Sequence, residues 1–265
     1  MKPWLFCFDM DGTILNGDSE LSIPTQEALL TLRQQGHKVA FVTGRTGIDM
    51  KETYLPHADY VLLNSGSKLL DTHSQQILFY DKIPASVARA LASQCLAREW
   101  LLYLIYDNIY FVTRITNGVL EFAAEIGKAP CLLTEINQLP MQDVDCFMAS
   151  CDREEIANEI LRQHLSLRCL PSAPGCCDIV CAQGGKWAGI CRLATLLEIP
   201  PSRILAMGNY DNDIDMIQGA RLGIAVANAS AKAKAAADYV TASDHNRNAL
   251  CEVLSHFSST EPFLT

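Results

Sequence analysis

The stretch FCFDMDGT, residues 6–13, places an apolar run directly before two aspartates that are one residue apart. Residues i and i+2 of a strand share a face, so Asp9 and Asp11 are expected to point into one crevice where the strand ends. Burying a carboxylate is costly unless something pairs with it. Two carboxylates this close repel each other, and one takes up a proton unless a cation neutralises them. The pattern therefore predicts a functional site at this strand end rather than a plain turn.

The residues that follow alternate between strand and helix patterns. Apolar runs at 4–8, 38–44 and 59–64 are typical of strands covered on both faces. An amphipathic stretch at 24–36 predicts a helix between the first two runs, and a second helix is expected between the next two. This order predicts an α/β fold with a doubly wound, Rossmann-like parallel sheet.

The middle of the chain has a different rhythm. Strand patterns there come in pairs, as at 100–114, where Asp107-Asn108 predicts a tight turn. The alternation of strand and helix returns near residue 184. We therefore expect a core domain of residues 1–82 and 184–265, interrupted by an inserted α+β domain of residues 83–183. Aromatic residues of the insert lie in strand-like runs and are expected in its core: Trp100, Tyr103, Tyr106 and Tyr110.

The composition excludes several classes of protein. The chain has 265 residues, 49% hydrophobic and 19% charged, which is typical of globular domains and argues against disorder. The formal net charge is −9 and no Lys/Arg cluster is present, so no nucleic-acid partner is expected. No run approaches the roughly 18 apolar residues of a membrane helix, so no membrane partner is expected either. No pattern indicates an obligate protein partner.

The cysteines and the N-terminus indicate a cytoplasmic location. The 11 cysteines form no C-x-x-C pair and are mostly in apolar runs, which favours buried, reduced thiols. Asp9 and Asp11 interrupt the N-terminal apolar run too early for a secretion signal.

Four polar clusters follow predicted core strands or begin a core helix. Ligands bind beyond the carboxyl ends of strands in a doubly wound sheet, which is where these clusters are expected to lie. Each cluster alone is a weak signal, because aspartates often cap helices and a lysine at a helix start is usually solvated. Their order along the chain makes the set informative. The clusters are DMDGT (9–13), TGR (43–45), Lys186 and GNYDND (208–213).

These residue types fit phosphoryl transfer. Mg²⁺ is typically held by one or two carboxylates with water and phosphate, which suits Asp9 and Asp11. Asp9 could serve as the nucleophile, and Asp11 as general acid and base. A transferring phosphoryl group needs donors and positive charge around its oxygens. The hydroxyl of Thr43, the backbone of Gly44 and the charge of Lys186 would provide them.

The four clusters in this order closely resemble motifs I to IV of the haloacid dehalogenase superfamily of phosphohydrolases. Residues 64–71 and 222–241 are similar to segments of its Cof-type sugar-phosphatase branch. The insert lies where that branch carries its α/β cap. The resemblance covers nearly the whole chain and implies a Mg²⁺-dependent phosphatase with a small phosphorylated substrate, such as a sugar phosphate.

The resemblance also implies roles for single residues. Asp9 would be the nucleophile and a Mg²⁺ ligand, and Asp11 the acid/base, with a backbone carbonyl on Mg²⁺. Arg45 would either reach the substrate or cap, or form a structural salt bridge. Lys186 would be catalytic and pair with both the phosphate and Asp9. The other positions assigned to phosphate binding are Met10 through its backbone N–H, Thr43, Gly44 and Asn212.

Motif IV departs from the family pattern. It usually begins Gly-Asp, and that aspartate binds the metal, whereas this chain has Gly208-Asn209. An amide oxygen can ligate but has no charge. We therefore expect Asn209 and Asp213 to share the metal role, directly or through water, with weaker affinity.

Three alternatives to phosphatase activity are open to different degrees. A phosphosugar mutase or other phosphotransferase needs the same four loops, so the sequence does not exclude it. A phosphometabolite-binding regulatory protein with a weakened site is favoured only by Asn209. Dehalogenation is disfavoured, because that chemistry has no use for a metal or for Asp11.

Overall fold

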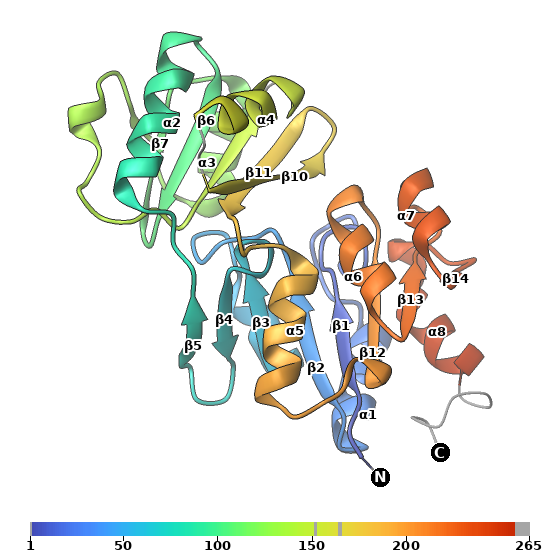
Figure 1. The fold of residues 1–265 in the computed structure, drawn as a ribbon. Helices are drawn as coiled ribbons and strands as arrows, with labels where there is room; N and C mark the ends of the chain where they lie inside the picture. The colour runs from blue at the N-terminus through green and yellow to red at the C-terminus, as the bar shows by residue number, and fades with distance from the viewer. Residues whose placement is uncertain (1, 151–152, 164–165, 258–265) are drawn as a thin grey trace.

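The computed structural model describes residues 2–150, 153–163 and 166–257, which form two lobes, each with its own β-sheet (Figure 1). The larger sheet has eight strands in the order β14-β13-β12-β1-β2-β3-β4-β5. Its first six strands in that order pair in parallel, and β4 and β5 add an antiparallel edge. The strands are β1 (Leu5–Phe8), β2 (Lys38–Val42), β3 (Tyr60–Leu63), β4 (Lys68–Asp71), β5 (Ile77–Tyr80), β12 (Ile204–Gly208), β13 (Leu222–Ala225) and β14 (Tyr239–Val240).

Helices cover both faces of this sheet, which confirms the predicted doubly wound α/β fold (Figure 1). No α-helix stands in the described residues 43–59 between β2 and β3, where one was expected. A 3₁₀ turn, Glu52–His57, stands there instead. It contains Pro56, which has no N–H to donate and disfavours a continuing α-helix. The helices are α1 (Ile23–Gln34), α5 (Lys186–Leu196), α6 (Ile214–Gly219), α7 (Ala231–Ala236) and α8 (Ala249–Phe257).

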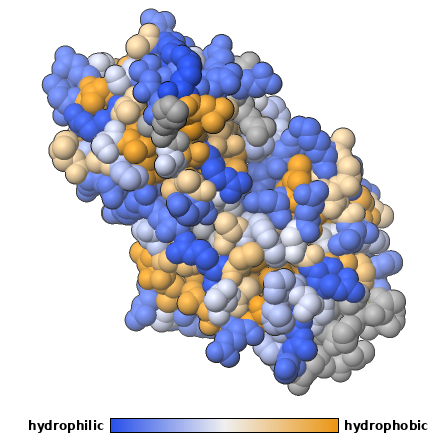
Figure 2. All heavy atoms as spheres, in the orientation of Figure 1, coloured by the Kyte–Doolittle hydropathy of each residue, from blue (hydrophilic) through white to orange (hydrophobic). Residues whose placement is uncertain are grey.

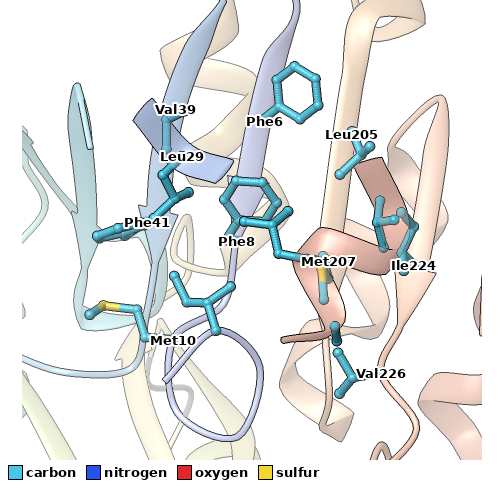
Figure 3. Close-up of a cluster of buried hydrophobic side chains, with 14 of the residues drawn as sticks. Phe6, Phe8, Met10, Leu29, Val39, Phe41, Leu205, Met207, Ile224 and Val226 are labelled. Carbon is cyan, nitrogen blue, oxygen red and sulfur yellow. The ribbon is translucent and has the colours of Figure 1, made fainter. Parts of the chain in front are cut away.

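The central strand β1 is buried on both faces because its side chains alternate between two apolar clusters. Phe6 and Phe8 point to the face covered by α1 and α8, where they join the cluster shown in Figure 3. Leu5 and Cys7 point to the face covered by α5. This double burial fixes the strand, and with it the position of the loop that follows.

The second sheet lies entirely within the predicted insert and has the order β10-β11-β9-β6-β7-β8. All of its pairings are antiparallel except β7–β8, in agreement with the predicted α+β pattern. The insert boundaries themselves stay a prediction. Its elements are α2 (Ala85–Ala97), β6 (Leu101–Tyr106), β7 (Ile109–Val112), α3 (Asn117–Ile126), β8 (Cys131–Leu132), β9 (Cys146–Ser150), α4 (Arg153–Arg162), β10 (Leu167–Ala173) and β11 (Cys176–Cys181).

The aromatic residues of this lobe are packing residues, as predicted. Tyr106 and Tyr110 are buried. Tyr103 and Tyr110 pack against Phe122 of α3, with ring centroids 5.8 and 5.5 Å away. Trp100 packs against the apolar cluster that contains Tyr106.

The smaller lobe sits over the carboxyl ends of the core strands (Figure 1). Ile48, from the loop after β2, is buried in the apolar cluster of the second sheet, beside Ile105 and Val180. The core loop that contains TGR is therefore packed directly against the cap lobe.

An apolar area lies over the edge strand β5 (Figure 2), where Ile77 and Leu78 are exposed. No helix in the described part of the chain is long and apolar enough to cross a membrane.

A left-handed turn after β3 connects two of the four predicted loops. Asn64, Ser65 and Gly66 all have positive φ. The Ser65 N–H donates to the Thr43 carbonyl, and the Gly185 N–H donates to the Ser65 carbonyl, each at 2.9 Å. A Cβ added at Gly66 would lie 2.3 Å from the Gly185 carbonyl oxygen. The turn therefore fixes the start of α5 against the loop after β2, and it needs glycine at Gly66.

We predict that Gly66→Ala destabilises the fold more than Gly175→Ala. Both glycines have positive φ, but a Cβ at Gly175 would meet nothing within 4 Å. The control should lose about 1 kcal/mol of unfolding free energy from backbone strain alone. Gly66→Ala should lose roughly a further 1–3 kcal/mol from the clash. Urea unfolding of both variants measures this, and equal losses would contradict the proposed close packing.

Candidate active site

Three of the four predicted clusters line one cavity of about 300 Å³ between the two lobes, and the fourth, Lys186, is buried behind its wall. The carboxyl ends of β1, β2 and β12 contribute one wall, and residues of β9, β10 and β11 contribute the other. The parallel register of neighbouring strands brings these ends together. The described residues that line the cavity are Asp9, Asp11, Thr43, Gly44, Arg45, Asp49, Met148, Ser172, Ala173, Pro174, Asp178, Asn209, Tyr210 and Asn212.

Lys186 bridges two carboxylates beneath this cavity. Its side chain is only 1% exposed, and Nζ lies 2.6 Å from Asp9 Oδ1 and 2.6 Å from Asp213 Oδ1. Burial alone would lower the pKa of Lys186, but Asp213 and Asp9 raise it above its ordinary value. Lys186 is therefore a permanent cation at the first residue of α5.

Asp9 is held at both carboxylate oxygens. Oδ1 accepts from Lys186, and Oδ2 accepts from the Thr13 hydroxyl at 2.7 Å. Burial and the neighbouring Asp213 raise the pKa of Asp9 to about 7, against the opposite effect of Lys186 and Thr13. Asp9 therefore needs further positive charge in the cavity to be fully ionised at neutral pH.

The predicted metal role of Asp213 does not fit the geometry. Asp213 is fully buried and does not line the cavity. Its Oδ1 accepts from Lys186, while Oδ2 accepts from the N–H groups of Asn209 and Tyr210 at 2.8 and 2.9 Å. We correct the prediction for Asp213 accordingly: it orients Lys186 and shapes its own loop. Asn209 does line the cavity, and its metal role stays a prediction.

Arg45 forms a salt bridge within the site, which is the second of the two roles considered from the sequence. Its Nε and Nη2 donate to the two oxygens of Asp11 at 2.8 and 2.7 Å, and Nη1 donates to the Asp49 carbonyl. Burial alone would lower the pKa of Arg45, but its hydrogen bonds and charge contact with Asp11 raise it. The bidentate pair fixes the Asp11 carboxylate in one orientation.

The predicted phosphate-binding residues divide into two groups. Thr43, Gly44 and Asn212 line the cavity together with Arg45. The Met10 side chain is buried in the core cluster shown in Figure 3, so only its backbone is available to a ligand.

The sequence analysis gave no role to two residues that the structure places at the site. Asn228 donates from Nδ2 to the Gly12 carbonyl at 2.8 Å and so braces the loop after β1. Asp178, on β11 of the cap lobe, lines the cavity and accepts from the Ser65 hydroxyl at 2.9 Å. A single acid in the otherwise apolar run CCDIVC was the available signal for Asp178.

The oxygen donors that line the cavity fit a hard cation, although one of them, Asn209, is neutral. Asp9, Asp11 and Asn209 all line the cavity, and oxygen ligands are those that Mg²⁺ prefers. Burial and Asp213 raise the pKa of Asp9, so a cation in the cavity would favour its ionised form. Within the described ranges, however, no three His, Cys, Asp or Glu side chains form a metal cluster.

A family model described as haloacid dehalogenase-like hydrolase matches residues 6–254 of the chain. The chain belongs to this family. Among curated relatives, the HMP-PP phosphatase of Cronobacter sakazakii is 28% identical over 263 residues, covering 96% of this chain and 95% of that protein. The 5-amino-6-(5-phospho-D-ribitylamino)uracil phosphatase YcsE of Bacillus subtilis is 25% identical over 242 residues, covering 89% of each.

Solved structures show the same fold. The subclass IIB sugar phosphatase BT4131 superposes with a TM-score of 0.85 at 21% identity, covering 96% of this chain and 99% of that one. BT1666 of Bacteroides thetaiotaomicron, analysed among phosphatases of this superfamily, gives 0.83 at 25% identity, covering 97% and 95%. The chain is thus a hydrolase of the phosphatase kind, in the Cof-type branch.

We predict that Arg45→Lys lowers kcat by roughly 10- to 100-fold, because an ammonium cannot hold both Asp11 oxygens in one orientation. The loss should be larger for an alkyl phosphate than for p-nitrophenyl phosphate, whose leaving group needs no proton. Steady-state kinetics on both substrates measure this. An equal loss on both would contradict a role of Arg45 in positioning Asp11.

Proposed function

We propose that the protein is a Mg²⁺-dependent phosphatase that hydrolyses a small phosphomonoester through an aspartyl-phosphate on Asp9. The observation that carries this proposal is the buried Lys186 bridge, which holds Asp9 at the cavity wall between two fixed partners. A carboxylate fixed in this way is oriented for attack and has no freedom to turn away.

In the first step, a carboxylate oxygen of Asp9 attacks phosphorus and the bond from phosphorus to the ester oxygen breaks. Asp11 donates a proton to the departing alcohol. Thr43, Gly44 and Lys186 provide donors and charge for the phosphoryl oxygens as negative charge develops.

In the second step, Asp11 removes a proton from water, and the water oxygen attacks phosphorus. The bond to Asp9 breaks, inorganic phosphate leaves and Asp9 is a free carboxylate again. The bidentate contact of Arg45 with Asp11 supports this alternation by keeping one carboxylate in place through both steps.

The residues that would hold Mg²⁺ are Asp9, Asp11 through its backbone carbonyl, and Asn209. When bound, the ion would supply the positive charge that Asp9 lacks and would offset charge on the phosphoryl oxygens. Asp213 supports the same site indirectly, through Lys186 and the backbone of Asn209.

The substrate class is a small phosphorylated metabolite. The relatives act on chemically different compounds by name, including a sugar phosphate for BT4131, so they support the reaction type and not one substrate. A cavity of about 300 Å³ suits a small leaving group. The mutase alternative and the cytoplasmic location stay predictions.

We predict hydrolysis of p-nitrophenyl phosphate in the presence of Mg²⁺ and its loss with EDTA. Asp9→Asn should lower kcat by more than about a thousand-fold, because an amide is no nucleophile. Asp211→Asn, in the same loop as Asp213 but paired with Lys232 away from Asp9, is the matched control and should retain activity. Release of p-nitrophenol measures this. A folded enzyme without turnover in any divalent metal would instead favour the phosphometabolite-binding alternative.

We predict that Asn209→Asp binds Mg²⁺ more tightly than the parent chain, because it adds a charged oxygen at the metal position. Titration of Mg²⁺ by calorimetry should show a Kd lower by roughly ten-fold. The Mg²⁺ concentration for half-maximal activity should fall in parallel. If the variant needs as much metal as the parent, Asn209 does not weaken the site.

A further inference from the structure

We propose, on the basis of the phosphatase function above, that Asp178 is a specificity-determining residue. It favours phosphomonoesters whose leaving alcohol carries hydroxyl or ammonium donors and disfavours those that carry a second anionic group. Three features of the structure support this. Asp178 lies beside the loop that is predicted to bind phosphate, no described lysine or arginine forms an ion pair with it, and the Arg45 guanidinium already has partners.

Asp178 reaches across the joint between the two lobes. It lies on β11 of the cap, yet a Cβ added at Gly44 of the core would lie 2.8 Å from Asp178 Oδ2. The same oxygen accepts from the Ser65 hydroxyl of the core at 2.9 Å, and Ser172 of β10 also hydrogen-bonds to the carboxylate. The side chain is therefore held at one place on the cavity wall, beside the loop that is predicted to bind phosphate.

Asp178 contributes a negative charge that Lys186 offsets only from beyond ion-pair distance. No lysine or arginine of the described chain forms an ion pair with it. Burial raises the pKa of Asp178 to about 6, so the group is mostly ionised at pH 8. Asp49 lines the same part of the cavity and adds a second carboxyl group.

The guanidinium of Arg45, in the same cavity wall, already has hydrogen-bond partners. Arg45 is the one lysine or arginine among the described lining residues, and its Nε, Nη1 and Nη2 donate to Asp11 and to the Asp49 carbonyl. Lys186 and a bound metal would serve the phosphoryl group. A second anionic group on the substrate would therefore face Asp178 without compensation, whereas a hydroxyl or ammonium group could donate to it.

The test compares three phenyl phosphates with hydroxymethyl, aminomethyl or carboxylate groups in the para position. Phosphate release gives kcat/KM for each at pH 8, for the parent chain, Asp178→Asn and Asp107→Asn. The amide retains the shape of Asp178 and an acceptor for Ser65 but removes the charge. Asp107 lies on the β6–β7 turn, outside the cavity, and its replacement changes the net charge by the same amount.

Differences in leaving-group chemistry cancel when each variant is compared with the parent. We expect Asp178→Asn to raise the ratio of carboxylate to aminomethyl substrate by roughly ten-fold, and Asp107→Asn to leave it unchanged. If Asp178→Asn does not fold, Asp178→Ser, which retains a hydroxyl to bond with Ser65, should give the same shift.

Two results would overturn the proposal. One is an unchanged substrate ratio in a folded Asp178 variant, and the other is an equal shift in Asp107→Asn. Failure of the proposed function looks different, because the parent chain would then hydrolyse neither these esters nor p-nitrophenyl phosphate.

Discussion

The ammonium of Lys186, shared between Asp9 and Asp213, is the interaction on which the rest of the site depends. Three charged groups are buried together, and removing a buried partner typically costs about 3–5 kcal/mol, because the remaining charge is left uncompensated. The bridge connects the loop after β1, the loop after β12 and the first residue of α5. One cation thus sets the relative positions of three chain segments and keeps the nucleophilic carboxylate from turning.

The bridge also supports the proposal that the site binds a metal. Two carboxylates share one ammonium. Burial and the second carboxylate, Asp213, raise the pKa of Asp9 to about 7, although Lys186 acts in the opposite direction. Positive charge in the cavity would complete the neutralisation that Lys186 begins. Because Asn209 is neutral, we expect the proposed metal to be bound more weakly than by a motif with aspartate.

The fold and the expected position of the site were predictable because they follow from local sequence patterns. The double burial of β1 follows from a run without polar residues, and the acids that follow it are adjacent in the sequence. The prediction of an α-helix before β3 was wrong, because Pro56 lies in that segment and disfavours a continuing helix. The contacts of single side chains were not predictable, because they depend on which loops meet in the folded chain. Asp213 was predicted to bind the metal, but its oxygens accept hydrogen bonds from Lys186 and from two backbone N–H groups. Arg45 binds Asp11, which is 34 residues away in the sequence. Asp178 reaches Ser65 across 113 residues, and no local pattern encodes that contact.

The Asp11→Asn variant tests most directly whether Asp9 is the residue that becomes phosphorylated. p-Nitrophenolate leaves without a proton, so this variant should still phosphorylate Asp9, while the second step should stall for want of a base. Mass spectrometry of the quenched variant should find one phosphoryl group on the peptide that contains Asp9, labile to hydroxylamine. It should be absent when Asp9 is also replaced by asparagine. A phosphoryl group on any other residue, or turnover by the double variant at the rate of Asp11→Asn, would contradict the account.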